Sequence, residues 1–237
     1  MGVFAVVAIA AAAWMLSGFG FALLAVPLLT VLIGAKAAVV GVGLLSPMLS
    51  LQLVLRSRRD VDVRTVALVI SASLLGMPIG LVVLSRADDR LLQAVIGLVV
   101  LIFVLALWRG LSFAHQGPGV ELGAGFASGV FATSTGTTGP PLVIALHGRG
   151  LEPSAFRATL GGVFLIQGSL SVIAFALVGE IGRSSIQVLL VGLPAAVLGV
   201  LAGEWGFARI DRERFRHLVL GMLVVSALIA LGGAAVG

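Results

Sequence analysis

Ten consecutive residues at positions 132–141, ATSTGTTGPP, interrupt a chain that is otherwise almost continuously apolar. Hydroxyl groups can donate hydrogen bonds to the oxygens of an anion without carrying charge themselves. Glycines allow a close approach to the backbone, and a helix that begins after the break presents unpaired N–H groups and the positive end of its dipole. These features predict an anion-binding site built from Thr133, Ser134, Thr135, Gly136, Thr137, Thr138, Gly139 and Pro140.

A second break of the same kind lies near the start of the chain, at residues 17–21, SGFGF. We expect Ser17, Gly18, Phe19 and Gly20 to form the other half of the site. Pro27, Pro140 and Pro141 fit early positions of the helices that follow the two breaks, where a missing N–H costs little.

Gln167 is a polar amide in the middle of an apolar segment, and an internal alignment of the chain places it opposite Ser46 and Pro47. These three residues are further candidates for substrate binding. A buried amide in a membrane helix also serves as a hydrogen-bonding link between helices, and the sequence favours neither reading for Gln167.

Other kinds of chemistry receive little support. His115, His147 and His217 are scattered, which argues against a metal site, and cysteine is absent, which excludes disulfides. Neither the G-x-S-x-G pattern of a serine hydrolase nor a phosphate-binding loop or cofactor motif occurs. The sequence therefore predicts a protein that is not an enzyme, with no catalytic residue, metal or cofactor.

The elements that position these residues follow from the composition, which is 59% hydrophobic and 11% charged, with a mean hydropathy of +1.20. Such values indicate a multi-pass integral membrane protein. We expect it in the plasma (inner) membrane. Beside apolar segments, the runs RSRR and RIDRERFR are typical of anchors to anionic membrane lipids rather than of nucleic-acid binding. Six segments are long enough to cross a bilayer: 37–55, 63–84, 91–108, 155–178, 186–207 and 215–236.

Two apolar regions remain, 3–33 and 119–148, and each contains one of the breaks. A continuous helix of either length would measure about 45 Å, which is too long for one crossing of a core of about 30 Å and too short for two. We therefore expect each region to be a broken helix that enters the membrane and returns to the same side. Backbone that leaves a helix at this depth must be buried in protein or line a cavity.

The distribution of positive charge supports the two hairpins, because cytoplasmic loops collect Lys and Arg. With hairpins, most of the 15 Lys and Arg residues fall on one face, and only Lys36, Arg86, Arg90 and Arg183 fall on the other. Full crossings would divide them more evenly. This topology places both termini on the non-cytoplasmic side.

The two halves of the chain resemble each other. Leu75, Gly76 and Gly80 align with Leu198, Gly199 and Gly203, and VPLL at 26–29 aligns with PPLV at 140–143. A hairpin plus three spans is an odd number of crossings, so the second copy must be inverted. The sequence predicts an all-α membrane domain of about eight segments in two inverted repeats, residues 1–110 and 119–237.

SGFGFALLAVPLL near the start and GAGFASGVFATSTGTTGPPLVIAL after the middle together resemble the paired signatures of the sulfite exporter TauE/SafE family of membrane permeases. The resemblance extends over nearly the whole chain, except residues 112–118. It implies a secondary transporter that exports a small sulfur-containing anion, such as sulfite or an organosulfonate, by alternating access. An anion channel and a permease for another small organic anion are the alternatives.

Several features stay open at this stage. Arg157 and Glu204 lie near the ends of their segments, where pairing with each other or reaching to the membrane surface explains them without a role in transport. The sequence does not give the coupling ion, a proton or another, nor does it decide whether the protein forms a homo-oligomer. The partners that it does predict are a small anionic substrate and membrane lipids, with no nucleic acid.

Overall fold

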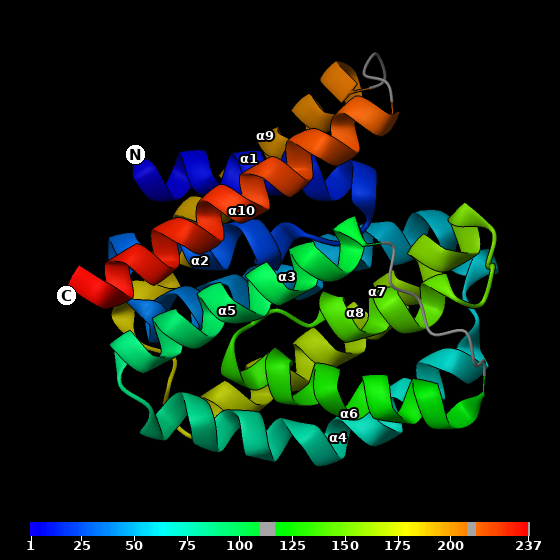
Figure 1. Cartoon of the computed structure of the whole chain (residues 1–237), viewed down its shortest axis with the longest axis horizontal. Helices are drawn as coiled ribbons and strands as arrows, with labels where there is room; N and C mark the ends of the chain where they lie inside the picture. The colour runs from blue at the N-terminus through cyan, green and yellow to red at the C-terminus, as the bar shows by residue number, and fades with distance from the viewer. Residues whose placement is uncertain (110–116, 208–211, 237) are drawn as a thin grey trace.

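The computed structural model describes the backbone of residues 1–109, 117–207 and 212–236, and within these ranges the side chains of 16, 17, 206, 207, 212–218, 235 and 236 lie outside the described part. The described backbone forms α-helices and a short 3-10 helix, with no strand (Figure 1). The helices are α1 (Gly2–Ser17), α2 (Phe21–Ile33), α3 (Ala35–Ser57), η1 (Arg58–Asp60), α4 (Val63–Arg86), α5 (Asp89–Trp108), α6 (Pro118–Ser134), α7 (Gly139–His147), α8 (Pro153–Leu177), α9 (Arg183–Phe207) and α10 (Arg212–Val236).

Both sequence breaks are breaks in the structure. Between α1 and α2, Gly18 has φ 74° and Gly20 has φ 105°, and between α6 and α7, Gly136 has φ 68°. These left-handed values are readily adopted only by glycine, which allows the chain to leave one helix and begin the next within a few residues. The prediction of a broken helix in each of the regions 3–33 and 119–148 is confirmed.

Each broken pair folds back on itself. A Cβ added to Gly2, at the start of α1, would lie 3.2 Å from Cδ1 of Leu32, near the end of α2. In the second pair, Glu121 in the first turn of α6 lies 2.8 Å from Arg149, which follows α7. The start of each pair therefore lies beside its own end, as in a hairpin.

The two hairpins open toward opposite ends of the bundle, as Figure 1 shows for the starts of α1 and α6. At one end, which we call the arginine-rich end, Arg56 pairs with Glu204 and Arg149 pairs with Asp62 and Glu121. At the other end, Lys36 donates to the backbone oxygen of Ser85 at 2.9 Å, and its backbone N–H donates to Asp89 at 3.3 Å. The α6–α7 hairpin opens at the arginine-rich end and the α1–α2 hairpin at the opposite one.

Helix packing places each hairpin against the other half of the chain. Helix α6 packs along α4 and helix α1 along α9, on opposite edges of the bundle in Figure 1, while α3 packs on α8 and α5 on α10. Glycines allow the first two contacts: a Cβ added to Gly76 or Gly80 on α4 would collide with backbone of α6. One added to Gly199 on α9 would collide with the carbonyl oxygen of Ala8. Close backbone approach of this kind is typical of helix association in membranes.

Five described helices are long and apolar enough to cross a membrane: 35–60, 63–86, 89–108, 153–177 and 183–205. They contain the first three predicted spans in full, and they contain 155–178 and 186–207 except for the last one and the last two residues. The sixth, 215–236, falls in α10, where 219–234 qualifies as a shorter apolar helix among the described residues. Large apolar side chains such as Leu75, Leu177 and Leu190 are exposed on these helices, as expected of a surface that faces lipid.

The expectation for Pro27 is wrong. Pro27 is the seventh residue of α2 and lies inside the helix rather than in its first turn. Its ring deprives the carbonyl of Leu23 of the usual helical partner, and the Thr30 hydroxyl donates to the Pro27 carbonyl at 2.7 Å. Pro140 and Pro141 do lie in the first turn of α7, as expected.

Candidate functional site

The two breaks meet at a cavity of about 50 Å³. By the same measure a single water needs roughly 10 to 15 Å³, so the cavity can hold a few waters or a small anion. Helices α3 and α8 complete its walls. Seven residues predicted for the site line it: Phe19, Gly20, Ser46, Gly136, Thr137, Thr138 and Gly139.

The other candidates lie behind this lining or outside the described part. Gly18, Pro47, Thr133, Ser134, Thr135, Pro140 and Gln167 do not line the cavity, and the side chain of Ser17 is not described. Pro47 packs against Gly168, where an added Cβ would lie 3.1 Å from the proline Cγ. The structure thus brings seven candidates together around one space and places seven others in supporting positions.

The first break contributes backbone donors. Gly20, Phe21, Ala22 and Leu23 all line the cavity, and the first helical hydrogen bond of α2 runs from the N–H of Leu24 to the oxygen of Gly20 at 3.0 Å. The N–H groups of Phe21, Ala22 and Leu23 therefore have no partner within the helix, and Gly20 offers no side chain to cap them. Together with the helix dipole they make a positive wall.

The second break contributes fewer backbone donors than expected. Thr138 precedes α7 without a capping bond from its side chain, and Gly139 is the first residue of the helix. Pro140 and Pro141 follow, and proline has no N–H. Helix α7 still directs the positive end of its dipole toward the cavity. Its hydrogen-bond donors must come mainly from side chains.

Most hydroxyls of the second break are already engaged. Thr133 donates to the Met77 oxygen at 2.7 Å, Ser134 to the Val130 oxygen at 2.7 Å, and Thr135 to the Phe131 oxygen at 3.2 Å. These bonds engage helix carbonyls, and those of Val130 and Phe131 also accept the backbone N–H four residues later. The three hydroxyls are thus held by the helices around the break and are not free for a ligand.

Two hydroxyls remain for a ligand. Thr138 and Ser50 line the cavity, and neither side chain has a hydrogen-bond partner among the described residues. Ser46 and Ser171 also line it, but their hydroxyls donate to carbonyls four residues earlier, at 2.9 Å each. Ser50 and Ser171 are not among the residues predicted from the sequence, although each lies one helical turn after a candidate, Ser46 or Gln167.

Gln167 supports the cavity from behind. It is 0% exposed, and the Ser128 hydroxyl lies 3.1 Å from its Oε1 and 2.9 Å from the carbonyl oxygen of Thr138. A hydroxyl has one proton, so it can donate to only one of these oxygens. In either orientation of the amide one buried polar atom has no partner, which leaves Gln167 able to bind a water or a ligand oxygen.

The remaining cavity wall is apolar, formed chiefly by Trp14, Phe21, Leu49 and Phe164. Sequence periodicity cannot distinguish such residues from ordinary helix packing. Among the described residues, no charged side chain lines the cavity, and no group of three His, Asp or Glu residues could hold a metal ion.

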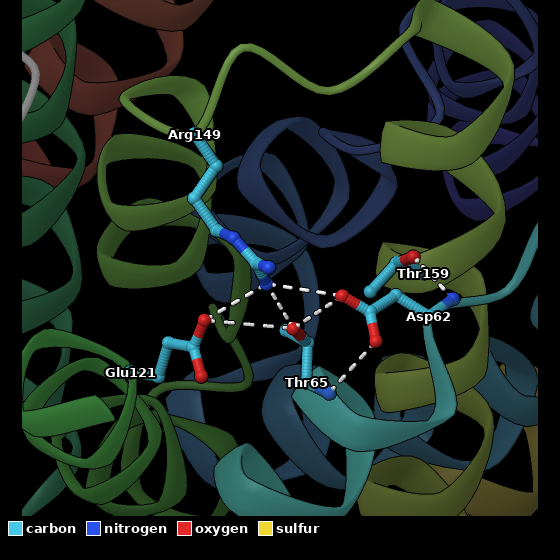
Figure 2. Close-up of polar contacts among 5 residues, drawn as sticks. All are labelled: Asp62, Thr65, Glu121, Arg149 and Thr159. Carbon is cyan, nitrogen blue, oxygen red and sulfur yellow. Dashed lines mark hydrogen bonds and ion pairs between the residues drawn. The ribbon is translucent and has the colours of Figure 1, made fainter. Parts of the chain in front are cut away.

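A charged cluster lies at the arginine-rich end (Figure 2). Arg149 binds Glu121 at 2.8 Å and Asp62 at 3.1 Å, and it also contacts the Thr65 hydroxyl. The backbone N–H of Asp62 donates to the Thr159 hydroxyl at 3.0 Å. The cluster joins the start of α4 to the starts of α6 and α8 and to the segment after α7.

The environment of Asp62 in this cluster lowers the pKa of its carboxyl group. Partial burial raises its pKa, but hydrogen bonds from Thr65 and the positive charge of Arg149 outweigh the burial, so the pKa lies below its ordinary value of 3.8. The ionised form is therefore the one that the fold stabilises.

A family model described as sulfite exporter TauE/SafE matches residues 3–230, which is nearly the whole chain. The chain belongs to the sulfite exporter TauE/SafE family. The resemblance seen in the two glycine-rich signatures is thus confirmed. Searches of curated proteins and of solved structures gave no match. The TauE/SafE assignment and the apolar helices together identify a multi-pass membrane protein of a transporter family.

The first prediction for this TauE/SafE protein concerns Gly139. A Cβ added there would lie 3.8 Å from Phe164 and 3.9 Å from Phe19, two residues of the cavity wall. We expect Gly139→Val to fill part of the cavity and to abolish anion binding without misfolding, as measured by equilibrium binding on purified protein. Gly123→Val is the matched control, since nothing lies within 4 Å of a Cβ at Gly123. Unchanged binding by Gly139→Val would place the site elsewhere.

The second prediction concerns the charged cluster. Because the folded state lowers the pKa of Asp62, its stabilisation is present above about pH 4 and is lost as the pH falls through the lowered pKa. We expect Arg149→Gln to lower the melting temperature in detergent at neutral pH. The difference from wild type should shrink below about pH 4.

Arg58→Gln, which removes an exposed arginine from the same end of the bundle, should have little effect at any pH. If the difference between wild type and Arg149→Gln stayed constant down to about pH 3, ionised Asp62 would not be what Arg149 stabilises.

Proposed function

We propose that this protein is a secondary transporter that binds a small sulfur-containing anion, such as sulfite or an organosulfonate, between the two breaks and exports it by alternating access. The observation that carries the proposal is the cavity at which the first turn of α2 presents three N–H groups without helical partners. Two free hydroxyls, of Ser50 and Thr138, face the same space. Uncharged donors suit a carrier, which must release its cargo as well as bind it.

The substrate class follows from the lining. Donors without acidic side chains favour an anion, because N–H groups and hydroxyls stabilise oxygen atoms that carry negative charge. The aromatic and aliphatic part of the wall can accept the short carbon chain of an organosulfonate. The choice of a sulfur-containing anion rests on the family. The volume of the cavity fits an anion of a few heavy atoms.

The inverted repeat is part of the proposal. If α1 to α5 exchange with α6 to α10, the contact of α4 with α6 becomes the contact of α9 with α1, and α3 with α8 and α5 with α10 map onto themselves. The glycines agree with this exchange: Gly76 on α4 and Gly199 on α9 are aligned in sequence, and each lies against the first helix of the opposite hairpin. Such symmetry supplies two related conformations for alternating access.

The charged cluster supports a carrier with a closed end. It links α4 of the first repeat to α6 and α8 of the second, so opening the arginine-rich end would require these contacts to separate. A channel is the runner-up function, and the small size of the cavity supports a carrier over a pore. The coupling ion and assembly into a homo-oligomer remain parts of the proposal without a residue assigned to them.

The topology prediction assigns the arginine-rich end to the cytoplasm of a cell whose plasma (inner) membrane contains the protein, with both termini outside. Single cysteines at Ser57 and Gly150 should react with a membrane-impermeant thiol reagent from the cytoplasmic side, and one at Ala87 from the outside. Because the chain contains no cysteine, each variant carries one label site. Labelling of Ser57→Cys and Ala87→Cys from the same side would rule out the three-span repeat. The 209–214 loop, expected on the cytoplasmic side, lies partly outside the described residues.

The function itself is tested with protein reconstituted in liposomes and offered sulfite, sulfate, thiosulfate, sulfoacetate and taurine in turn. We expect saturable flux of sulfite or an organosulfonate that the other bound anions inhibit. Flux that rises in proportion to concentration without saturation would indicate a channel instead. No flux above that of empty liposomes for any member of the panel would contradict the proposal.

A further inference from the structure

Arg157 lies against the first break, near the start of α8. Its Nη2 donates to the carbonyl oxygen of Met15 at 2.8 Å, in the last turn of α1. A Cβ added to Gly18 would lie 3.0 Å from the Arg157 Cγ. Met15 and Gly18 lie in sequence between Trp14 and Phe19, which line the cavity. Of the two explanations that the sequence left open, pairing of Arg157 with Glu204 does not occur, since Glu204 pairs with Arg56.

Arg157 lies where the electrostatics of the first break would otherwise oppose the binding of an anion. Helix α1 ends beside the cavity, and its last carbonyls carry the negative end of the helix dipole, which opposes the binding of an anion. The Arg157 guanidinium donates to one of these carbonyls, that of Met15, and it adds a full positive charge.

Most of the donors on Arg157 remain available. A guanidinium has five N–H groups, and the bond to Met15 uses one of them. Its Nε is buried without a partner, and no carboxylate among the described residues lies within the 4.0 Å of an ion pair, unlike the situation of Arg56 and Arg149. Buried, uncompensated donors of a charged group are costly, and such an arrangement is typical of a site whose partner is a ligand.

Arg157 also lies on the side of α8 that faces the cavity. Phe164, Gly168 and Ser171 line the cavity, and they follow Arg157 by 7, 11 and 14 residues, the spacing of one helix face. Arg157 is thus about two turns from Phe164, roughly 10 Å along the helix toward the arginine-rich end. Arg157 therefore lies on the side of the cavity that is nearer to the arginine-rich end.

We propose that Arg157 is an anion-binding residue at the arginine-rich side of the cavity, which receives the oxyanion through its free N–H groups and makes the site selective for anions over neutral analogues. This inference rests on the proposed function of the cavity, and it goes beyond it by assigning the charge that the cavity lining lacks.

The test uses Trp14, a cavity residue that is 4% exposed, as a fluorescent probe in a Trp108→Phe, Trp205→Phe background. The two tryptophans removed are 71% and 75% exposed. Sulfite and methanesulfonate are titrated into this protein in detergent. Arg157→Gln retains a donor for the Met15 carbonyl but removes the charge, and Arg157→Lys retains the charge. Arg58→Gln controls for the loss of one positive charge at the same end.

We expect Arg157→Gln to weaken the binding of both anions by about tenfold to a hundredfold, the usual effect of losing a hydrogen bond to a charged group. Arg157→Lys should stay within about threefold of the parent, because a point charge is retained. Equal affinities of Arg157→Gln and the parent would show that Arg157 only caps α1. Absence of anion binding by the parent protein would instead overturn the proposed function, and the role of Arg157 with it.

In a second variant, the affinity of the same polypeptide is compared at different pH values, so the result does not depend on the stability of Arg157→Gln. In Arg157→His, the affinity for methanesulfonate should fall as the pH rises through the titration of histidine, near pH 6.5. Methanesulfonate keeps its single charge over this range, and the affinity of the parent should stay constant. A flat pH profile for Arg157→His would contradict a role for charge at this position.

Discussion

Backbone that leaves a helix inside a membrane must find hydrogen-bond partners, and this requirement governs the structure. Both breaks produce a helix end with unpaired carbonyls and a helix start with unpaired N–H groups. At the end of α1, Arg157 donates to the carbonyl of Met15. The N–H groups at the start of α2 have no partner within the helix, and they line a cavity. The free N–H groups of α2 are what makes the centre of the bundle suitable for an anion.

The rest of the fold keeps the two breaks facing each other. Each hairpin packs along a long helix of the other half, α6 on α4 and α1 on α9, and glycines such as Gly76 and Gly199 permit backbone contact. Close packing of this kind holds the breaks at a fixed depth without polar contacts in the lipid. At the two ends of the bundle, charged side chains such as Arg149 and Lys36 join segments from different helices.

Features that depend on length and local chemistry could be predicted from the sequence. The two hairpins follow from apolar regions of unsuitable length with glycine-rich breaks, and both are present. Features that depend on tertiary contacts could not. The position of Pro27 inside α2 could not be predicted, because nothing in the sequence marks Phe21 rather than a later residue as the start of the helix. The sequence places Arg157 only at the end of a helix. Its contact with Met15 could not be predicted, because it joins positions 142 residues apart. Ser50 was missed because a single serine among apolar residues carries no local signal.

The central claim is that the anion binds between the two breaks. Crystals soaked with selenite, a heavier analogue of sulfite, would locate the anion directly by the anomalous scattering of selenium. The account predicts a selenium peak within hydrogen-bonding reach of the N–H groups of Phe21, Ala22 and Leu23 and of the Thr138 hydroxyl. Selenium peaks confined to the exposed arginines at the end of the bundle, with none between α2 and α7, would contradict it.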